Sequence, residues 1–305
     1  MKLEGIHHIT AITEDAQRNV DFYAGVLGLR LVKKTVNQDN PTVYHLFFAD
    51  EGGDPGSDLT FFEYPGAAQG RAGAGMVHRI VWRVASSEAL DFWAGRLGDN
   101  DVEVGREGDS LLFSDPEGLD HELLVVDVTD QPLIADHPEI PGEVALQGFH
   151  AVRAYTDSSE ASSGLLEALE FERSDGVWEA RGDRRGGLYV YDEAPPERGL
   201  QGAGSVHHVA WASQPDELMD WREKAVAGDA QPTPEIDRFY FRSIYFREPS
   251  GVLFEIATLG PGFTVDEPLE HLGEKLSLPP AFEHLRDEVE PKLRPVVNPR
   301  VQARG

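Results

Sequence analysis

The chain of 305 residues contains no cysteine. This absence excludes disulfide bonds, thiolate nucleophiles and metal sites built on thiolates. Any metal ion must therefore be held by imidazole and carboxylate groups, with tyrosine or water as further ligands. Long apolar runs are missing as well. None reaches the roughly 18 residues that a transmembrane helix needs, so no membrane span is expected.

Basic residues are scarce. The sequence has 27 lysine and arginine residues against 54 acidic ones, and its net charge is -27. Such a surface repels nucleic acids and anionic membranes, so neither is expected as a partner. In the simplest interpretation the acidic residues form a solvated surface, and adaptation to a salt-rich cytoplasm is a further hypothesis. Residues 1–5 lack the apolar segment of a signal peptide, so a cytoplasmic protein is expected.

A short, mostly apolar segment that contains histidine occurs four times. Its copies begin at Gly5, Gly75, Gly148 and Gly204. Each copy is typical of a β-strand, and each is followed by a helical pattern and then by alternating segments. The repeated unit is therefore one strand, one helix and three strands, and a single unit has too little core to be stable alone. We expect an α+β protein with four βαβββ modules in two tandem pairs.

The boundaries of these pairs follow from composition. Residues 127–144 contain three prolines and few apolar residues, and this pattern predicts a linker. The N-terminal pair of modules is expected at 1–130 and the C-terminal pair at 145–262. Residues 263–305 form a C-terminal tail, in which the stretch 280–290 has a helical pattern.

Two of the modules share an ending. In the second, Pro116 opens a Pro-x-Gly turn and Glu122 follows; in the fourth, Pro249 opens the same turn and Glu255 follows. A Pro-x-Gly turn of this kind connects two strands of a hairpin. The glutamate therefore lies on the outgoing strand, at the same position in both modules.

Doubled histidines at positions 7–8 and 207–208 are the strongest chemical signal. Neighbouring side chains of a strand point to opposite faces, so one histidine of each pair faces a given cleft. Two histidines and a carboxylate are three protein ligands for a divalent metal, and they leave open positions for chemistry. The residues allow three ligand sets: His8, His208 and Glu255; His150, His208 and Glu255; or His8, Glu63, His78 and Glu122.

These motifs resemble those of the vicinal oxygen chelate superfamily, which contains glyoxalases, bleomycin resistance proteins and extradiol dioxygenases. Within it, the chain is similar to ring-cleaving dioxygenases of the hydroquinone type, notably over residues 237–247, which lead to Glu255, and over 278–283. The resemblance implies the vicinal oxygen chelate fold with a helical tail. It favours Fe(II), with Mn(II) as a substitute, bound by His8, His208 and Glu255. The set with His150 belongs to catechol-cleaving relatives, and the third set to glyoxalase I relatives.

The resemblance also implies five residues around the substrate, namely His7, His207, Arg238, Tyr245 and Thr10. We expect His207 and Tyr245 to act as proton donors, and His7 and Arg238 to steady a phenolate. The implied reaction is extradiol-type cleavage of a hydroquinone- or catechol-type aromatic diol by O2. The alternatives are a glyoxalase-like isomerase or lyase and a metal-free protein that binds small molecules. The sequence leaves open whether the chain forms a homo-oligomer.

Overall fold

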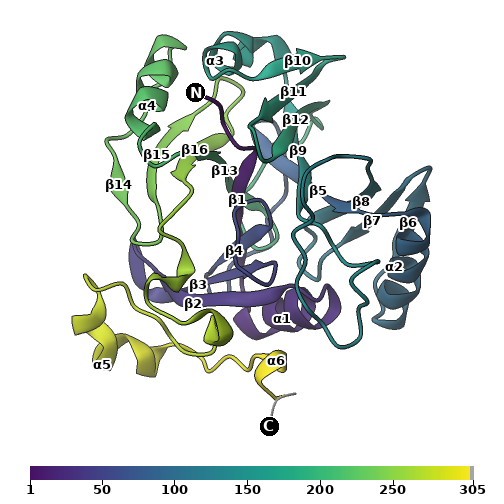
Figure 1. Ribbon diagram of the computed structural model, residues 1–305, viewed down its shortest axis with the longest axis vertical. Coiled ribbons are helices and arrows are strands. Elements are labelled where there is room, and N and C mark those ends of the chain that lie inside the picture. The colour runs from purple at the N-terminus through teal and green to yellow at the C-terminus, as the bar shows by residue number, and fades with distance from the viewer. Residues whose placement is uncertain (303–305) are drawn as a thin grey trace.

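A computed structural model describes residues 1–302 of the chain and contains two eight-stranded β-sheets (Figure 1). The first sheet has the strand order β14-β15-β16-β13-β1-β4-β3-β2 and is built from the first and fourth modules. The first module comprises β1 (Ile6–Thr13), α1 (Ala16–Val20), the π-helical turn η1 (Asp21–Val26), β2 (Arg30–Asn37), β3 (Asn40–Ala49) and β4 (Asp58–Glu63). The fourth comprises β13 (Val206–Ser213), α4 (Leu218–Ala227), β14 (Ile236–Asp237), β15 (Arg242–Arg247) and β16 (Leu253–Thr258).

The second sheet has the order β10-β11-β12-β9-β5-β8-β7-β6 and is built from the second and third modules. The second module comprises β5 (Met76–Val84), α2 (Ser87–Asp99), β6 (Val104–Glu107), β7 (Ser110–Ser114) and β8 (Asp120–Val125). The third comprises β9 (Phe149–Thr156), the 3-10 turn η2 (Ser159–Ser162), α3 (Ser163–Ala168), β10 (Glu172–Ser174), β11 (Val177–Arg181) and β12 (Gly186–Glu193).

This architecture confirms the α+β fold with four βαβββ modules. The sheets, however, join the first module with the fourth and the second with the third, through antiparallel pairs β1–β13 and β5–β9. Every module offers its first strand as an open edge, so chain order alone does not decide which two edges meet. The division of the chain at 1–130, 145–262 and 263–305 remains a prediction.

The first strand of each module follows a glycine with a positive φ angle, a backbone conformation that glycine alone adopts at low energetic cost. Gly5 precedes β1 with φ 74°, and Gly148 precedes β9 with φ 86°. A side chain at Gly5 would also meet the backbone of Gly186 at 2.8 Å. The glycine therefore fixes where the strand starts.

The tail runs along the outer edge of the first sheet, below β2 in Figure 1. Its elements are short, namely η3 (Phe263–Val265), η4 (Leu269–His271), η5 (Glu283–Leu285), α5 (Arg286–Val289), η6 (Glu290–Lys292) and α6 (Pro299–Gln302). Buried Lys33 on β2 anchors it through Asp266, at 2.7 Å, and through Glu267. The helical pattern at 280–290 is confirmed as a series of single turns. No helix within residues 1–302 is long and apolar enough to cross a membrane.

Candidate metal centre

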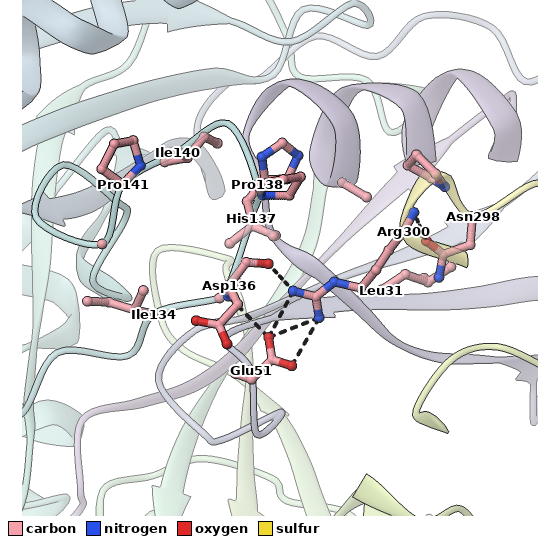
Figure 2. A pocket seen from close by; sticks show the side chains of 16 residues that line it. Leu31, Glu51, Ile134, Asp136, His137, Pro138, Ile140, Pro141, Asn298 and Arg300 are labelled. Carbon is pink, nitrogen blue, oxygen red and sulfur yellow. Dashed lines mark hydrogen bonds and ion pairs between the residues drawn. The ribbon is translucent and has the colours of Figure 1, made fainter. Parts of the chain in front are cut away.

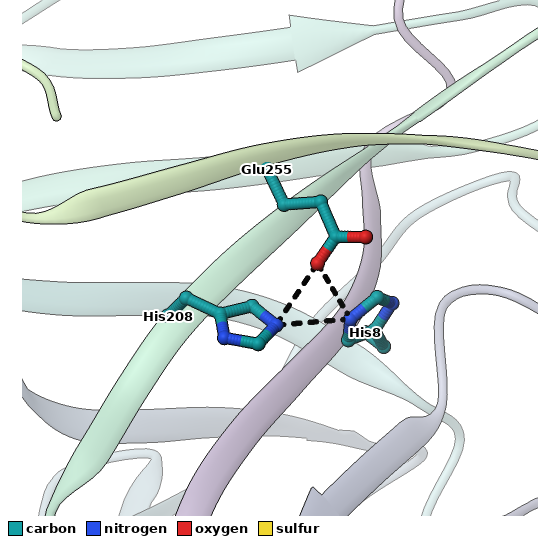
Figure 3. Close-up of side chains that lie close together, drawn as sticks. All are labelled: His8, His208 and Glu255. Carbon is teal, nitrogen blue, oxygen red and sulfur yellow. Dashed lines mark hydrogen bonds and ion pairs between the residues drawn. The ribbon is translucent and has the colours of Figure 1, made fainter. Parts of the chain in front are cut away.

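Three adjacent strands of the first sheet bring His8, His208 and Glu255 together (Figure 3). Ala210 on β13 has His8 of β1 as its neighbour on one side and Glu255 of β16 on the other. His208 precedes Ala210 by two residues, so its side chain lies on the same face. The register of the sheet therefore directs three side chains from distant parts of the sequence to one point.

The three ligand atoms are close and buried. His8 Nε2 lies 3.2 Å from His208 Nε2 and 3.1 Å from Glu255 Oε2, and His208 Nε2 lies 2.9 Å from the same oxygen. All three side chains are almost wholly shielded from solvent. Within residues 1–302 this is the one group of three or more histidine and acidic side chains whose geometry suits a metal ion.

The preceding histidine sets the tautomer of His8. His7 Nε2 lies 3.1 Å from the carbonyl oxygen of Thr258, which can only accept, so this nitrogen carries a proton. Burial, and then the neighbouring His8, lower the pKa of His7 to about 3, so the ring is neutral and its Nδ1 is an acceptor. His8 Nδ1, 2.9 Å away, therefore donates to it. The Nε2 atom of a neutral His8 is left with a lone pair that points at Glu255.

His208 has the same kind of partner. Its Nδ1 lies 2.8 Å from His207 Nδ1. Burial, and then the neighbouring His208, lower the pKa of His207 to about 4, so His207 is also a neutral ring. When His208 Nδ1 donates, its Nε2 presents a second lone pair toward Glu255, and His207 carries its own proton on Nε2.

Glu255 is held from the opposite side. Its Oε1 accepts a hydrogen bond from the Ser243 hydroxyl and another from the Tyr245 hydroxyl at 3.0 Å. Its Oε2 has no hydrogen-bond donor within the described part of the chain. Burial alone would raise the pKa of Glu255, but the positive charge that His8 and His208 carry when protonated, and the hydrogen bonds that they then donate, hold it well below its usual range. The carboxylate therefore stays ionised and faces two imidazole nitrogens.

A cavity of about 430 Å³ opens beside these three residues. Three of the five residues predicted around the substrate line it, namely His207, Arg238 and Tyr245. The other two do not. His7 lies behind His8, and Thr10 is buried and bonded to Thr60 at 2.8 Å.

Arg238 and Tyr245 form one wall of this cavity as a unit. Arg238 Nε donates to the Tyr245 hydroxyl at 3.2 Å, and the guanidinium lies 5.3 Å from the centre of the tyrosine ring. Burial, and then the charge of Glu255, raise the pKa of Tyr245, so the phenol keeps its proton and donates to Glu255. The other side of the guanidinium forms two bonds to Asp39, at 3.2 and 3.1 Å.

Sequence reasoning missed His45 and Asp39, which also line the cavity. His45 lies on β3 between the rings of Phe47 and Phe62, at centroid distances of 4.0 and 4.4 Å. The alternation of β3 places His45 and Phe47 on one face, and that pattern was the available signal. Asp39 lies between β2 and β3 and carries no motif.

The alternative ligand sets are not brought together within residues 1–302. His150 lies on β9 in the other sheet, where burial, and then Arg83, lower its pKa to about 4. His78 bonds to Asp192 at 2.8 Å. Glu122 lies 3.4 Å from Arg79, and Glu63 accepts from the backbone of Ala16. His78, Glu122 and Glu63 therefore have protein partners of their own.

A second cavity, of about 580 Å³, lies between η1, the segment 134–142 and residues 298–300 (Figure 2). Arg300 crosses it to Glu51 at 2.9 Å and also contacts the backbone oxygen of Asp136. None of the residues predicted for metal or substrate lines this cavity. The contacts of Arg300 connect the C-terminal segment to the rest of the protein.

Comparisons with known proteins place this geometry in a family. Residues 5–123 match the model of the glyoxalase/bleomycin resistance protein/dioxygenase superfamily. A relative from Bacillus subtilis, named as the ring-cleaving dioxygenase MhqA, is 39% identical over 97% of this chain and 100% of its own length. The chain belongs to the glyoxalase/bleomycin resistance protein/dioxygenase superfamily. The resemblance that the sequence motifs suggested is thereby confirmed.

Other members of the superfamily extend the comparison. MhqO of B. subtilis, also named as a ring-cleaving dioxygenase, is 42% identical over 96% of this chain and 97% of its own. Chlorohydroquinone/hydroquinone 1,2-dioxygenase of Sphingobium indicum is 34% identical over 94% of this chain and 95% of its own. The crystal structure of a B. subtilis protein titled as a dioxygenase superposes with a TM-score of 0.90 at 40% identity, over 97% of this chain and 98% of that one.

Proposed function

We propose that this protein is a ring-cleaving dioxygenase that binds Fe(II), with Mn(II) as the alternative, and cleaves a hydroquinone-type aromatic diol with O2. The observation that carries the proposal is the convergence of two imidazole lone pairs and a carboxylate oxygen on one buried point. Such an arrangement is repulsive without a cation between the three atoms. Two histidines and one carboxylate are the ligand set of non-haem Fe(II) oxygenases.

The separations of the ligand atoms support such an ion. With metal–ligand bonds of about 2.1 Å, adjacent ligands of an octahedral ion lie about 3.0 Å apart. Ligands of a tetrahedral zinc ion lie about 3.4 Å apart. The observed separations of 3.2, 3.1 and 2.9 Å lie in the range in which three atoms can bind one ion. His8, His208 and Glu255 would hold the ion, and the ion would supply open positions for substrate and O2 together with one-electron chemistry.

The residues of the cavity suit an aromatic diol. Phe47, Phe62 and Phe241 give the cavity apolar walls, and its volume suits a ligand of one ring. Arg238 places a positive charge where a phenolate oxygen would be stabilised in a water-poor pocket. His207, with its proton on Nε2, is the candidate proton donor, while the Tyr245 proton is engaged by Glu255.

The names of the relatives support this substrate class. The S. indicum relative is named for chlorohydroquinone and hydroquinone, and the two B. subtilis relatives are named for ring cleavage. The similarity covers nearly the whole of each chain, so both sheets and the cavity between the first and fourth modules fall within it.

Oxygen uptake tests the proposal. Protein stripped of metal should take up O2 with hydroquinone only after Fe(II) is added, whereas Zn(II) should give none because zinc has no redox chemistry. Catechol serves as the second substrate. A glyoxalase-like enzyme would work with Zn(II) or Ni(II) and consume no O2. Fe(II)-loaded protein that consumes no O2 with either diol would overturn the proposal.

A further inference from the structure

Hydrogen bonds connect three side chains in a row, from β1 through β4 to the cavity wall on β3. The Thr10 and Thr60 hydroxyl oxygens are 2.8 Å apart, and Thr60 Oγ1 lies 2.9 Å from His45 Nε2. Both threonines are wholly buried, whereas His45 lines the cavity. The two threonines are direct neighbours across the parallel pair β1–β4, so the contact is set by sheet register.

The number of available protons decides which group donates in each of these hydrogen bonds. Burial, and then His8 and His208, lower the pKa of His45 well below its ordinary value, so the ring carries one proton. If His45 donated to Thr60, then Thr60 would donate to Thr10, whose hydroxyl has no acceptor within the described residues. In the reverse direction Thr10 donates to Thr60 and Thr60 donates to His45 Nε2, so both buried hydroxyl protons are used and only the ring proton, at the cavity wall, is left without a partner. The proton of His45 is then on Nδ1.

Phe62 neighbours both His45 and a candidate metal ligand. The centre of its ring lies 4.4 Å from that of His45 and 6.4 Å from that of His208. Two other polar side chains of the cavity wall are engaged elsewhere: Gln38 donates to the Arg238 backbone, and Tyr240 donates to Asp266. His45 Nδ1 has no partner within the part of the chain that the structure describes, so its proton is available to a ligand.

We propose that His45 binds the hydroxyl of a para-diol that is remote from the metal, and that Thr60 and Thr10 position it by fixing its tautomer. This inference rests on the proposed function, because it assumes that the other oxygen of the diol sits at His8, His208 and Glu255. A para-diol carries its oxygens at opposite ends of the ring, and His45 lines the same cavity as His8, His208 and Glu255 from a different strand. The two oxygens of catechol are adjacent, so catechol bound at the metal does not reach His45.

Binding without O2 tests the inference separately from turnover. The Fe(II)-loaded protein is titrated under nitrogen with hydroquinone, with phenol, which lacks the remote hydroxyl, and with catechol. The wild-type protein should bind hydroquinone more tightly than phenol by roughly tenfold, which corresponds to one hydrogen bond to a fixed donor. His45→Phe keeps an aromatic ring between Phe47 and Phe62 and should abolish that preference, while catechol affinity changes less than twofold.

The positioning residues have matched variants. Thr60→Val keeps the shape of the side chain but removes the hydroxyl, and should lower the preference for hydroquinone over phenol severalfold. Thr60→Ser restores the hydroxyl and should restore the preference. Thr42→Val makes the same chemical change on an exposed position of β3 and should leave the preference unchanged. Circular dichroism of each variant checks that the sheet is intact.

The outcomes separate the two proposals. Equal affinities of the wild-type protein for hydroquinone and phenol, or an unchanged preference in folded His45→Phe, would overturn the assignment of His45 even if O2 uptake is normal. A preference that disappears in His45→Phe and in Thr60→Val, and returns in Thr60→Ser, would support it even where O2 uptake fails. A loss of affinity for all three ligands alike would indicate a general change of the cavity and would also reject the assignment.

Discussion

The two sheets share one scaffold, but they place different side chains at the same positions. In the first sheet, Ala210 lies between His8 and Glu255. In the second, Val81 lies between Ala151 and Glu122 in the same register. Both glutamates accept a hydrogen bond from a serine of the adjoining strand, Ser243 for Glu255 and Ser110 for Glu122.

The difference lies in the other two positions. Where the first sheet has His208, two residues before Ala210, the second has Arg79, two residues before Val81. The guanidinium of Arg79 lies 3.4 Å from Glu122. In the second sheet, therefore, a side chain of the protein supplies the positive charge opposite the carboxylate. Ala151 stands where His8 stands in the first sheet. The scaffold thus places a glutamate at this position twice, and two neighbouring residues decide between an ion pair and a candidate metal site.

Removal of a ligand should have the largest effect. His208→Ala leaves two of the three ligands, and we expect metal affinity to fall by more than about 100-fold, since even outer partners of metal ligands contribute 10- to 100-fold. O2 uptake should be lost with it. The control is Arg79→Ala at the matching position of the second sheet, which should keep normal metal content. Metal analysis and an oxygen electrode measure both, and normal iron in folded His208→Ala would refute the assignment.

Rebuilding the second sheet should give the next largest effect. Arg79→His combined with Ala151→His copies the ligand set of the first sheet around Glu122, and should raise binding from one to two Mn(II) ions per chain. The larger side chain at buried Ala151 should cost about 1–3 kcal/mol of stability, so folding is checked by thermal melting. The single variant Arg79→His is the control. A folded double variant that still binds one ion would show that the register alone does not make a site.

Acid should act on the second sheet independently of metal. Burial lowers the pKa of His121 on β8 to about 3, against about 6.5 in the unfolded chain. Between these values the unfolded state binds one more proton, so stability falls as pH decreases, at about 1.4 kcal/mol per pH unit. His121→Gln should remove this part of the slope, with or without Mn(II), in urea unfolding from pH 6.5 to 4. The exposed His284→Gln is the control, and an unchanged slope in His121→Gln would contradict the prediction.

The smallest effect is expected at the rim of the cavity. Asp39 is 73% exposed in its pair with Arg238, and exposed ion pairs contribute at most about 1 kcal/mol. Asp39→Asn should therefore raise the KM for hydroquinone by no more than about fivefold, because Arg238 is held less firmly over Tyr245. Glu160→Gln breaks the exposed pair with Arg173 in the third module and should change nothing. A larger loss would mean that Asp39 contacts the substrate.

The sequence predicted the modules because each repeats a glycine, a strand and a helix in the same order. The sequence did not predict which modules pair, since the contact between β1 and β13 depends on which open strand edges meet in space. The doubled histidines and the turn motif allowed three ligand sets, and the family resemblance favoured His8, His208 and Glu255. The structure brings these three side chains together.

One alternative arose from a shift of a single residue. Counted from the glycine that opens each strand, His150 follows Gly148 by two positions, as His7 follows Gly5, and it therefore matches His7 rather than His8. A shift of one residue on a strand reverses the face. His45 was missed for a different reason: a single histidine in an alternating strand gives no sign of the Thr60 contact beneath it.

The union of the first and fourth modules has a consequence for biosynthesis. His8 and His208 are 200 residues apart in the sequence, and the strand that carries Glu255 follows later still. A nascent chain on the ribosome therefore carries an unfinished edge at β1 until its last module emerges, and such distant pairings close slowly. Only a chain that already contains β16 can hold the proposed ion, so products that terminate before this strand should lack it.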